Sequence, residues 1–328
     1  MSADRPVHRR IALTAVSATL LIAACAAGGA PSQLQPSPSD AASPSAAAAF
    51  PLTLVDDEGT AVAIKAEPQR IASLSPANTE TVFALGAGDR LVGGTMSDDF
   101  PADAAALPDV ADFDSVLMEQ LVAADPDLVL AAGNGLNKPA DIARIRELGI
   151  PVVVLYPEDV PSVLEDIELI GQAIGKADEA DAITAAMQAR IDDVSTAAAA
   201  VPQPRTFYEI AVDTSIWGPT DDSFTSDMIT LAGGEAITTG SPTASNVSLE
   251  RLVDADPEVI VLGDANYGMT PDQVAARPGW EDMTAVKSGA IRPVDDLIVT
   301  RPGPRLADGL AALAMAIHPD LVLPSAAP

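Results

Sequence analysis

The sequence is poor in aromatic residues, cysteine and histidine. Aromatic residues make up 3% of the 328 positions, and there are one cysteine and two histidines. A single cysteine can form no disulfide within the chain. Serine hydrolases usually pair their nucleophile with a histidine, and zinc or manganese receptors need several nitrogen or carboxylate ligands. Beyond the first segment the only histidine is His318, which we expect at a helix end near terminal carbonyls. Both of these classes are therefore disfavoured.

Motifs of catalysis are also missing from the sequence. It contains no Gly-x-Ser-x-Gly elbow, no phosphate-binding glycine loop and no cluster spaced to hold a metal. We therefore expect no catalytic residue, no metal site and no resident cofactor, and hence a protein that is not an enzyme. A chelatase-like enzyme is the less favoured alternative, because it would need such ligands.

Basic residues are scarce relative to acidic ones. The chain has 18 Lys and Arg against 47 Asp and Glu, for a net charge of −29. Three of the arginines, Arg5, Arg9 and Arg10, lie in the first 24 residues, so the remainder is even more acidic. Such a surface repels phosphate backbones, which argues against a nucleic acid partner.

Long apolar runs are absent as well. The run from Ile11 to Ala24 is shorter than the ~20 residues needed to span a bilayer. It follows a basic segment and ends Ile-Ala-Ala-Cys, which resembles a bacterial lipobox with Cys25 as the diacylated first mature residue. An ordinary signal peptide with a chance cysteine, or a membrane helix, are the alternatives. We expect a lipoprotein signal peptide over residues 1–24 and a lipid-anchored, extracytoplasmic protein.

The next segment, residues 25–49, is rich in Ala, Ser and Pro and has almost no large apolar side chains. It cannot bury enough surface to order itself, so it is expected to be a disordered tether. After it, Leu52–Leu54 and Val62–Ile64 flank Asp-Glu-Gly, which is typical of a β-hairpin.

A repeat is the strongest sign of the architecture. Met118 to Leu130 and Leu249 to Val261 match at an offset of 131 residues. Each copy reads as a short helix, an Asp-Pro break and a continuous apolar strand of the kind found in parallel sheets. This self-similarity predicts two related α/β lobes.

Helical periodicity dominates the stretch between the copies, from Ser162 to Ala200. Its apolar residues recur at steps of three and four: Val163, Ile167, Ile170, Ile174, Ala180, Ile183, Met187, Ile191 and Val194. Asp178 is predicted to cap a second segment of about 34 Å at 1.5 Å per residue. A surface helix of one domain is the alternative. We favour an N-terminal α/β lobe at 50–160, a connecting helical backbone at 161–200 and a C-terminal α/β lobe at 201–328.

Two loops carry a resemblance to a known family. Ser75-Pro76-Ala77-Asn78-Thr79-Glu80 joins a strand to a helix, and Ser97-Asp98-Asp99-Phe100-Pro101 follows the next strand. These segments, with the repeat and Arg301 to Leu306, resemble the substrate-binding proteins of cobalamin and iron-siderophore ABC importers, over about Arg70 to Pro319. The resemblance implies two lobes with parallel sheets, joined by one long rigid helix, with a ligand cleft between the lobes.

The ligand is expected outside the carboxyl ends of the strands. The residues assigned to this cleft are Ser75, Pro76, Asn78, Ser97, Phe113, Trp217, Tyr267, Asp296 and Arg301. Trp217 as a core residue and Arg301 as a surface residue are the alternatives. The cobalamin-binding relative has tryptophans where this chain has Phe113 and Ala132, and a tyrosine in place of Ser97, so stacking on a corrin ring would be weaker.

The resemblance also gives a role to one glutamate in each copy of the repeat. Glu119 and Glu250 match the residues that dock such proteins onto arginine pockets of the permease dimer. Both would otherwise be helix-start carboxylates, favoured there by the helix dipole; Ser248 can cap its helix, whereas Leu117 replaces that serine in the other copy. We therefore expect a monomeric receptor for a metal chelate that delivers its ligand to an ABC permease. A corrinoid is favoured; a ferric siderophore, or heme held by Tyr156 or Tyr267, is the alternative, and a structural or adhesive surface lipoprotein is the other class.

Overall fold

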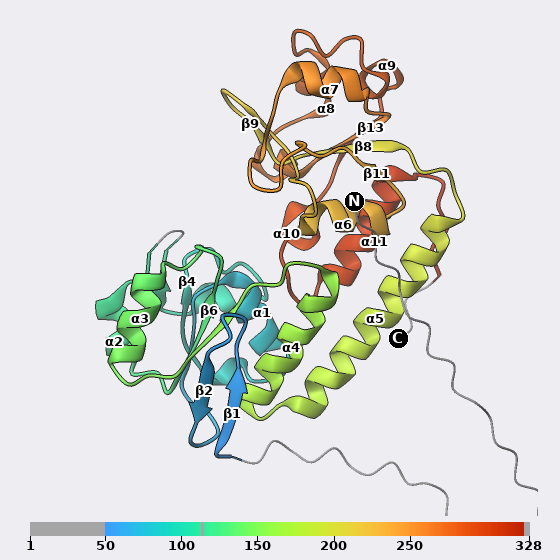
Figure 1. The fold of residues 1–328 in the computed structure, drawn as a ribbon. Helices are drawn as coiled ribbons and strands as arrows, with labels where there is room; N and C mark the ends of the chain where they lie inside the picture. The colour runs from blue at the N-terminus through green and yellow to red at the C-terminus, as the bar shows by residue number, and fades with distance from the viewer. Residues whose placement is uncertain (1–49, 113–114, 325–328) are drawn as a thin grey trace, which may run out of the picture. The chain divides into compact units, whose positions relative to one another are not determined.

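The N-terminal lobe is built on a parallel sheet of five strands. The computed structural model describes residues 50–112 and 115–324. The sheet has the order β5-β4-β3-β6-β7, and Figure 1 shows it beside helices α1 to α4. Its strands are β3 (Ile71–Ser73), β4 (Leu91–Thr95), β5 (Asp109–Ala111), β6 (Leu128–Ala132) and β7 (Val152–Leu155).

Short helices and a hairpin complete this lobe. The helices are α1 (Pro76–Ala84), α2 (Met118–Ala124) and α3 (Pro139–Glu147), with 3-10 turns η1 (Gly88–Arg90) and η2 (Ala104–Ala106). The predicted hairpin is confirmed, because β1 (Leu52–Val55) pairs antiparallel with β2 (Ala61–Ile64). The Asp57 N–H of its turn donates to the Val154 carbonyl at 3.1 Å, which joins the hairpin to the edge strand β7.

The C-terminal lobe repeats the parallel arrangement on a smaller scale. Its four-stranded sheet has the order β11-β8-β13-β14, and a three-stranded antiparallel sheet has the order β12-β10-β9. The strands are β8 (Arg205–Glu209), β9 (Ala211–Val212), β10 (Ile216–Trp217), β11 (Glu235–Ala236), β12 (Asn246–Val247), β13 (Val259–Leu262) and β14 (Ile291–Pro293). The helices are α6 (Phe224–Leu231), α7 (Leu249–Ala255), η3 (Gly263–Tyr267), α8 (Pro271–Ala275), α9 (Thr284–Ser288), α10 (Asp296–Val299) and α11 (Leu306–Ile317).

The predicted repeat forms the same structure twice. Each helix, α2 or α7, ends at an aspartate in the left-handed region, with φ of 49° at Asp125 and 45° at Asp256. An arginine at the start of the sheet then donates to the carbonyl of that aspartate: Arg70 to Asp125 at 2.7 Å and Arg205 to Asp256 at 3.1 Å. The arginines satisfy helix-end carbonyls that have no partner within the helix. The duplication therefore extends beyond the matching segments to β3 and β8, the strands at whose start these two arginines lie.

Two antiparallel helices connect the sheets, α4 (Val160–Ile174) and α5 (Ala177–Ala199). They lie side by side in Figure 1, and the chain turns between them at Gly175, whose φ of +74° suits glycine. The predicted periodic segments are confirmed as these two helices. The prediction that Asp178 caps the second one is wrong: α5 begins at Ala177, so Asp178 already lies in its first turn. The side-chain cap occurs in α4 instead, where Asp159 accepts from the Ser162 N–H at 2.9 Å.

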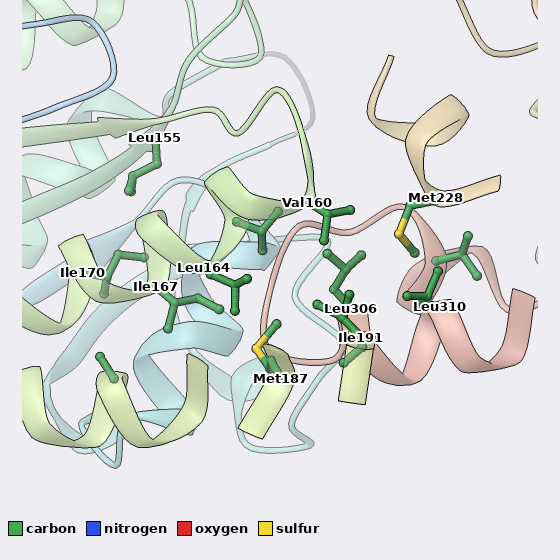
Figure 2. Packing of buried hydrophobic residues seen from close by; sticks show 14 of the residues in the cluster. Leu155, Val160, Leu164, Ile167, Ile170, Met187, Ile191, Met228, Leu306 and Leu310 are labelled. Carbon is green, nitrogen blue, oxygen red and sulfur yellow. The ribbon is translucent and has the colours of Figure 1, made fainter. Parts of the chain in front are cut away.

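One apolar cluster runs through the connecting helices into both lobes. It contains Leu128 and Leu130 of β6, α4 and α5 residues such as Ile167 and Met187, and Leu310 of α11. Figure 2 shows α4, α5 and α11 side chains of this cluster close together. Separate clusters cover the other face of each sheet, so even continuously apolar strands alternate between two cores. The lobes are thus joined by shared packing as well as by the covalent chain, which resists bending between them.

Candidate functional site: the cleft between the lobes

The N-terminal sheet has a topological switch point between β3 and β6. From β3 the chain moves to β4 on one side, whereas β6 lies on the other, so the loops after β3 and β6 diverge. Asn137 bridges these loops: its Oδ1 accepts from the Ala132 N–H at 2.7 Å and its Nδ2 donates to the Leu74 carbonyl at 3.2 Å. A crevice at the carboxyl ends of strands is the usual ligand site in open α/β sheets. In the C-terminal sheet β8 and β13 occupy the equivalent position.

A cavity of about 480 Å³ lies between the two lobes at these strand ends. Its N-terminal wall includes Pro76, Ser97 and Leu136, and its C-terminal wall includes Tyr267 and Arg301. Two of the apolar or aromatic side chains are well exposed, Tyr267 at 78% and Leu136 at 46%. Exposed apolar surface that faces a cavity offers contact area for a large ligand. We call this space the interlobe cleft.

A second cavity of about 270 Å³ adjoins the interlobe cleft. Pro76, Leu136 and Arg301 line both spaces. The inner walls come from the start of α1, the ends of β6 and β7, and α4, and they include Asn78 and Asp166. We call this space the side cavity. Another hollow, of about 510 Å³, lies between β2 and the amino end of β7, so its walls come from one lobe only.

Ion pairs join the lobes at the boundary of these cavities. Arg301 contacts Glu80 Oε1 at 2.5 Å and Asp99 Oδ1 at 2.6 Å. Arg305 donates to both Glu80 oxygens, at 2.7 and 2.8 Å, and its guanidinium lies 4.1 Å from the centre of the Phe100 ring. The Glu80 side chain is only 3% exposed, so the two arginines compensate a buried carboxylate. Two arginines of the C-terminal lobe thereby neutralise a buried carboxylate on α1 of the N-terminal lobe.

This arrangement changes the expected role of Arg301. Burial acts to lower its pKa, but the hydrogen bonds to Asp99 and Glu80 outweigh burial and leave the pKa raised. Arg301 therefore remains a cation, yet two carboxylates already contact it. Of the described residues that line the two cavities, it is the only Lys, Arg or His. The cleft consequently has little positive charge to offer an anion.

The structure brings most of the predicted ligand residues together. Those that line one or both cavities are Ser75, Pro76, Asn78, Ser97, Tyr267 and Arg301. Phe113 and Cys25 lie outside the described residues. Trp217 and Asp296 are not among the described residues that line either space: the Trp217 indole donates to Asp213 at 3.2 Å, and Asp296 accepts from the Tyr208 hydroxyl at 2.6 Å. The Tyr208 contact fastens α10 to the central strand β8.

Sequence reasoning missed several residues of the site. Leu136 and Asn137 lie on the loop after β6, and Asn266 lies in η3; only the fold defines where these segments are. Asp166 had a detectable signal, because it stands three residues after Val163 on the apolar face of α4. Burial is the first cause that raises its pKa, to about 8, and the neighbouring Asp57 and Glu165 contribute. A carboxyl group is thus protonated at neutral pH inside the side cavity.

The two repeated glutamates lie in matching places away from the cleft. Glu119 and Glu250 are exposed residues in the first turns of α2 and α7. Ser248 caps α7 by accepting from the Arg251 N–H at 3.2 Å, whereas Leu117 provides no side-chain cap for α2, as predicted. His318 Nε2 lies 3.0 Å from the Gly233 carbonyl, close to the end of α6 rather than beside its own helix.

Over residues 50–112 and 115–324, no three His, Cys, Asp or Glu side chains come together in a way that could hold a metal ion. Within the same ranges no helix has both the length and the apolar character to cross a bilayer.

The comparison with protein families agrees with this geometry. The sequence model of the Periplasmic binding protein family matches residues 71–296. The chain belongs to this family. Membership confirms the predicted resemblance, and it accounts for two parallel sheets facing each other across a cleft.

Individual periplasmic binding proteins extend the comparison. The uncharacterized ABC transporter substrate-binding lipoprotein YvrC of Bacillus subtilis is 33% identical over 83% of this chain and 87% of its own length. The cobalamin-binding protein of Halobacterium salinarum strain R1 is 30% identical over 95% and 86%. Among solved structures, the periplasmic heme-binding protein RhuT from Roseiflexus sp. RS-1 superposes with a TM-score of 0.68 and 24% identity, over 76% of this chain and 98% of RhuT. That level of identity supports the predicted α/β fold alone.

Proposed function

We propose that this protein is the substrate-binding lipoprotein of an ABC importer and that it captures a metal chelate, preferably a corrinoid, in the interlobe cleft. The observation that carries the choice of ligand is the chemistry of the cleft. Its exposed apolar surface comes from Leu136 and Tyr267, and the one cation among its described lining residues, Arg301, is already paired with Glu80 and Asp99. The relative named as a cobalamin-binding protein supports the same choice.

Charge separates the candidate ligands. A ferric siderophore with anionic oxygens, or heme with its two carboxylates, needs positive or donor groups to replace its water. The cleft instead places Asp99 and Asp112 in its wall, within a chain whose net charge is −29. A corrinoid carries neutral amide arms around a broad apolar ring, so it can bury surface against Leu136 and Tyr267 without exposing an anion to these carboxylates.

Heme is the second candidate because of Tyr267. A tyrosine oxygen is a known axial ligand of heme iron. Tyr267 is 78% exposed and lines the cleft, so its phenol is accessible to a bound ligand. Tyr156 is less suited to this role, since its hydroxyl already donates to the Asp57 carbonyl at 3.1 Å.

The proposed receptor makes and breaks no bond. Its lobes would close only slightly around the ligand, because the apolar cluster that spans α4, α5 and α11 would have to be disrupted by a large rotation. In this proposal residues 1–24 are a signal peptide, Cys25 bears the lipid and residues 25–49 are the tether. The lobes at 50–160 and 201–328, joined by 161–200, form a monomeric receptor that docks on a permease dimer through Glu119 and Glu250.

Calorimetric titration of the purified protein tests the choice of ligand. Cobalamin, heme and a ferric hydroxamate siderophore are titrated separately at neutral pH and moderate salt. We expect cobalamin to bind at least about tenfold more tightly than the other two, which corresponds to about 1.4 kcal/mol. Repeating the heme titration with Tyr267→Phe removes the possible iron ligand. If heme binds most tightly and loses affinity with that variant, heme is the ligand and the corrinoid proposal is wrong.

A further inference from the structure

The side cavity adjoins the interlobe cleft and has walls of its own that a flat ring in the cleft would leave free. Its volume is about 270 Å³, and it shares Pro76, Leu136 and Arg301 with the cleft. A water molecule takes about 30 Å³ of liquid volume, roughly a ninth of this space, so a ligand side arm of four or five non-hydrogen atoms fits with room to spare. The inner walls decide which chemistry such an arm would have.

Asn78 gives the cavity a hydrogen-bond donor without a partner. The side chain is 6% exposed, and its Nδ2 atom is buried with no hydrogen-bond partner among the described residues. Leaving a buried amide donor unsatisfied costs about 1–3 kcal/mol, and native proteins rarely do so. Nδ2 itself has less than 1 Å² of accessible surface, so a carbonyl oxygen in the cavity would satisfy it once the Asn78 side chain turns towards that space.

Asp166 gives the opposite wall a carboxyl group that carries no charge at neutral pH. Burial, with the neighbouring Asp57 and Glu165, raises its pKa to about 8, and the proton is shared in a hydrogen bond with Asp57. The Asp57 carboxylate also accepts from the Tyr156 N–H at 2.6 Å, which holds the pair in place. An oxygen of such a carboxyl pair can accept from a ligand N–H.

The remaining wall excludes anionic arms. Leu155 of β7 and Ile167 and Ile170 of α4 line the cavity, and Figure 2 shows these side chains on their two elements. Arg301, the only cation among the residues that the structure describes in this lining, is paired with Glu80 and Asp99. An anionic arm would meet carboxyl groups and apolar carbon, with the Asp166 and Asp57 pair keeping one negative charge. A primary amide matches both polar walls, since its oxygen can accept from Asn78 while its N–H donates to the carboxyl pair.

We propose that the side cavity binds one primary amide arm of the ligand and thereby distinguishes corrinoids from chelates whose arms are carboxylates. This inference rests on the proposed receptor function and adds the residue that recognises the amide arm. Asn78 is its central donor, and Ile170 contributes to the depth of the space.

Three variants, titrated with cobalamin by calorimetry, test the inference. Asn78→Leu removes the donor and keeps the number and branching of the side-chain non-hydrogen atoms, and Ile170→Phe fills the space. Ile174→Phe is the matched control, because Ile174 is buried on the same helix and in the same cluster but does not line the cavity. We expect the first two to weaken cobalamin binding about tenfold, in line with one unsatisfied buried partner, and the control to bind as wild type does. Since Nδ2 has no described partner to lose, Asn78→Leu should melt no lower than wild type.

The outcomes separate this inference from the receptor proposal. If wild type binds cobalamin and both Asn78→Leu and Ile170→Phe bind it equally well, the cavity holds only water and the inference is overturned while the receptor proposal stands. If wild type binds no corrinoid, both are overturned. If Ile174→Phe also weakens binding through a general loss of packing, Asn78→Leu alone decides, together with its melting temperature.

Discussion

At the residue scale, buried acidic groups define the character of the site. Glu80 is surrounded by Arg301 and Arg305 of the opposite lobe, so its burial links the two halves of the molecule. Asp166 is buried beside Asp57 rather than beside arginines, so a proton neutralises its carboxyl group instead. The difference follows from position: α1 faces residues 301–305 of the C-terminal lobe, whereas Asp166, on the connecting helix α4, faces Asp57 of the N-terminal lobe. Both arrangements keep net charge out of the interior.

The protonated Asp166 makes stability depend on pH. Its pKa is about 8 in the folded protein against an ordinary 3.8, so the folded state retains a proton that the unfolded state releases. The stabilisation is complete below pH ~4 and is lost as pH rises through 8. We therefore expect the melting temperature to fall between pH 5 and pH 9, and to fall less in Asp166→Asn. Asp193→Asn, an exposed change on α5, serves as the control; equal pH dependence in wild type and Asp166→Asn would contradict the assignment.

At the element scale, the duplicated helices α2 and α7 present matching exposed surfaces. Glu119 and Glu250 occupy the first turn of each, where the helix dipole favours a carboxylate by about 0.3–1 kcal/mol. This stabilisation by the helix dipole is enough to explain a glutamate at either position without a binding partner. The duplication adds a second fact: both are exposed, and each lies on the helix that precedes an inner strand of its lobe. A partner with two related halves can contact both at once.

The docking role predicts a separation of binding from transport. In Glu119→Ala with Glu250→Ala, the ligand dissociation constant should stay within about twofold of wild type, because neither residue lines either cavity. Ligand uptake by cells that carry the importer should fall at least about tenfold, since two charge-assisted contacts are removed. Glu147→Ala with Glu281→Ala, one exposed glutamate from each lobe, is the control. Normal uptake by the first pair would leave these residues as helix-start carboxylates only.

At the scale of the whole molecule, shared packing and ion pairs oppose large movements of the lobes. The cluster through α4, α5, α6 and α11 includes residues of both sheets, and Arg301 and Arg305 reach across to Glu80. In the proposed receptor this packing would limit ligand release to a small displacement of the lobes, which a docked permease would impose from outside. Retention near that permease would then depend on the segment that precedes the folded part.

Anchoring is tested at Cys25, which lies outside the described residues. In a bacterial host that processes lipoproteins, Cys25→Ser should leave an unprocessed precursor or release the protein from the membrane fraction, because acyl chains provide the attachment. Fractionation and intact mass of the product measure this. Ser32→Ala, in the same segment, should change neither. If the mass and the membrane fraction are also unchanged in Cys25→Ser, the lipoprotein proposal is wrong.

Much of the fold could be predicted because its signals are local. The apolar steps around Ile167 and Met187 specify amphipathic helices through the geometry of a single turn. The Asp-Pro segments at Asp125 and Asp256 end two helices in the same left-handed geometry. Their repetition at a fixed offset then implies two lobes, and parallel strands put the loops with Ser75 and Ser97 on one edge. These properties depend on residues that are close together in the sequence, so the sequence alone was enough to predict them.

Only the tertiary structure decided what those residues contact. Arg301 was predicted as a cation for the ligand, but it pairs with Glu80, which is 221 residues away in the sequence. Trp217 was predicted at the cleft, and it lies in a small antiparallel sheet instead. The protonation of Asp166 likewise depends on burial beneath the cleft and on Asp57, from a different element. Ion pairing and desolvation act over a few ångströms in space, and the sequence does not encode such distances until the chain has folded.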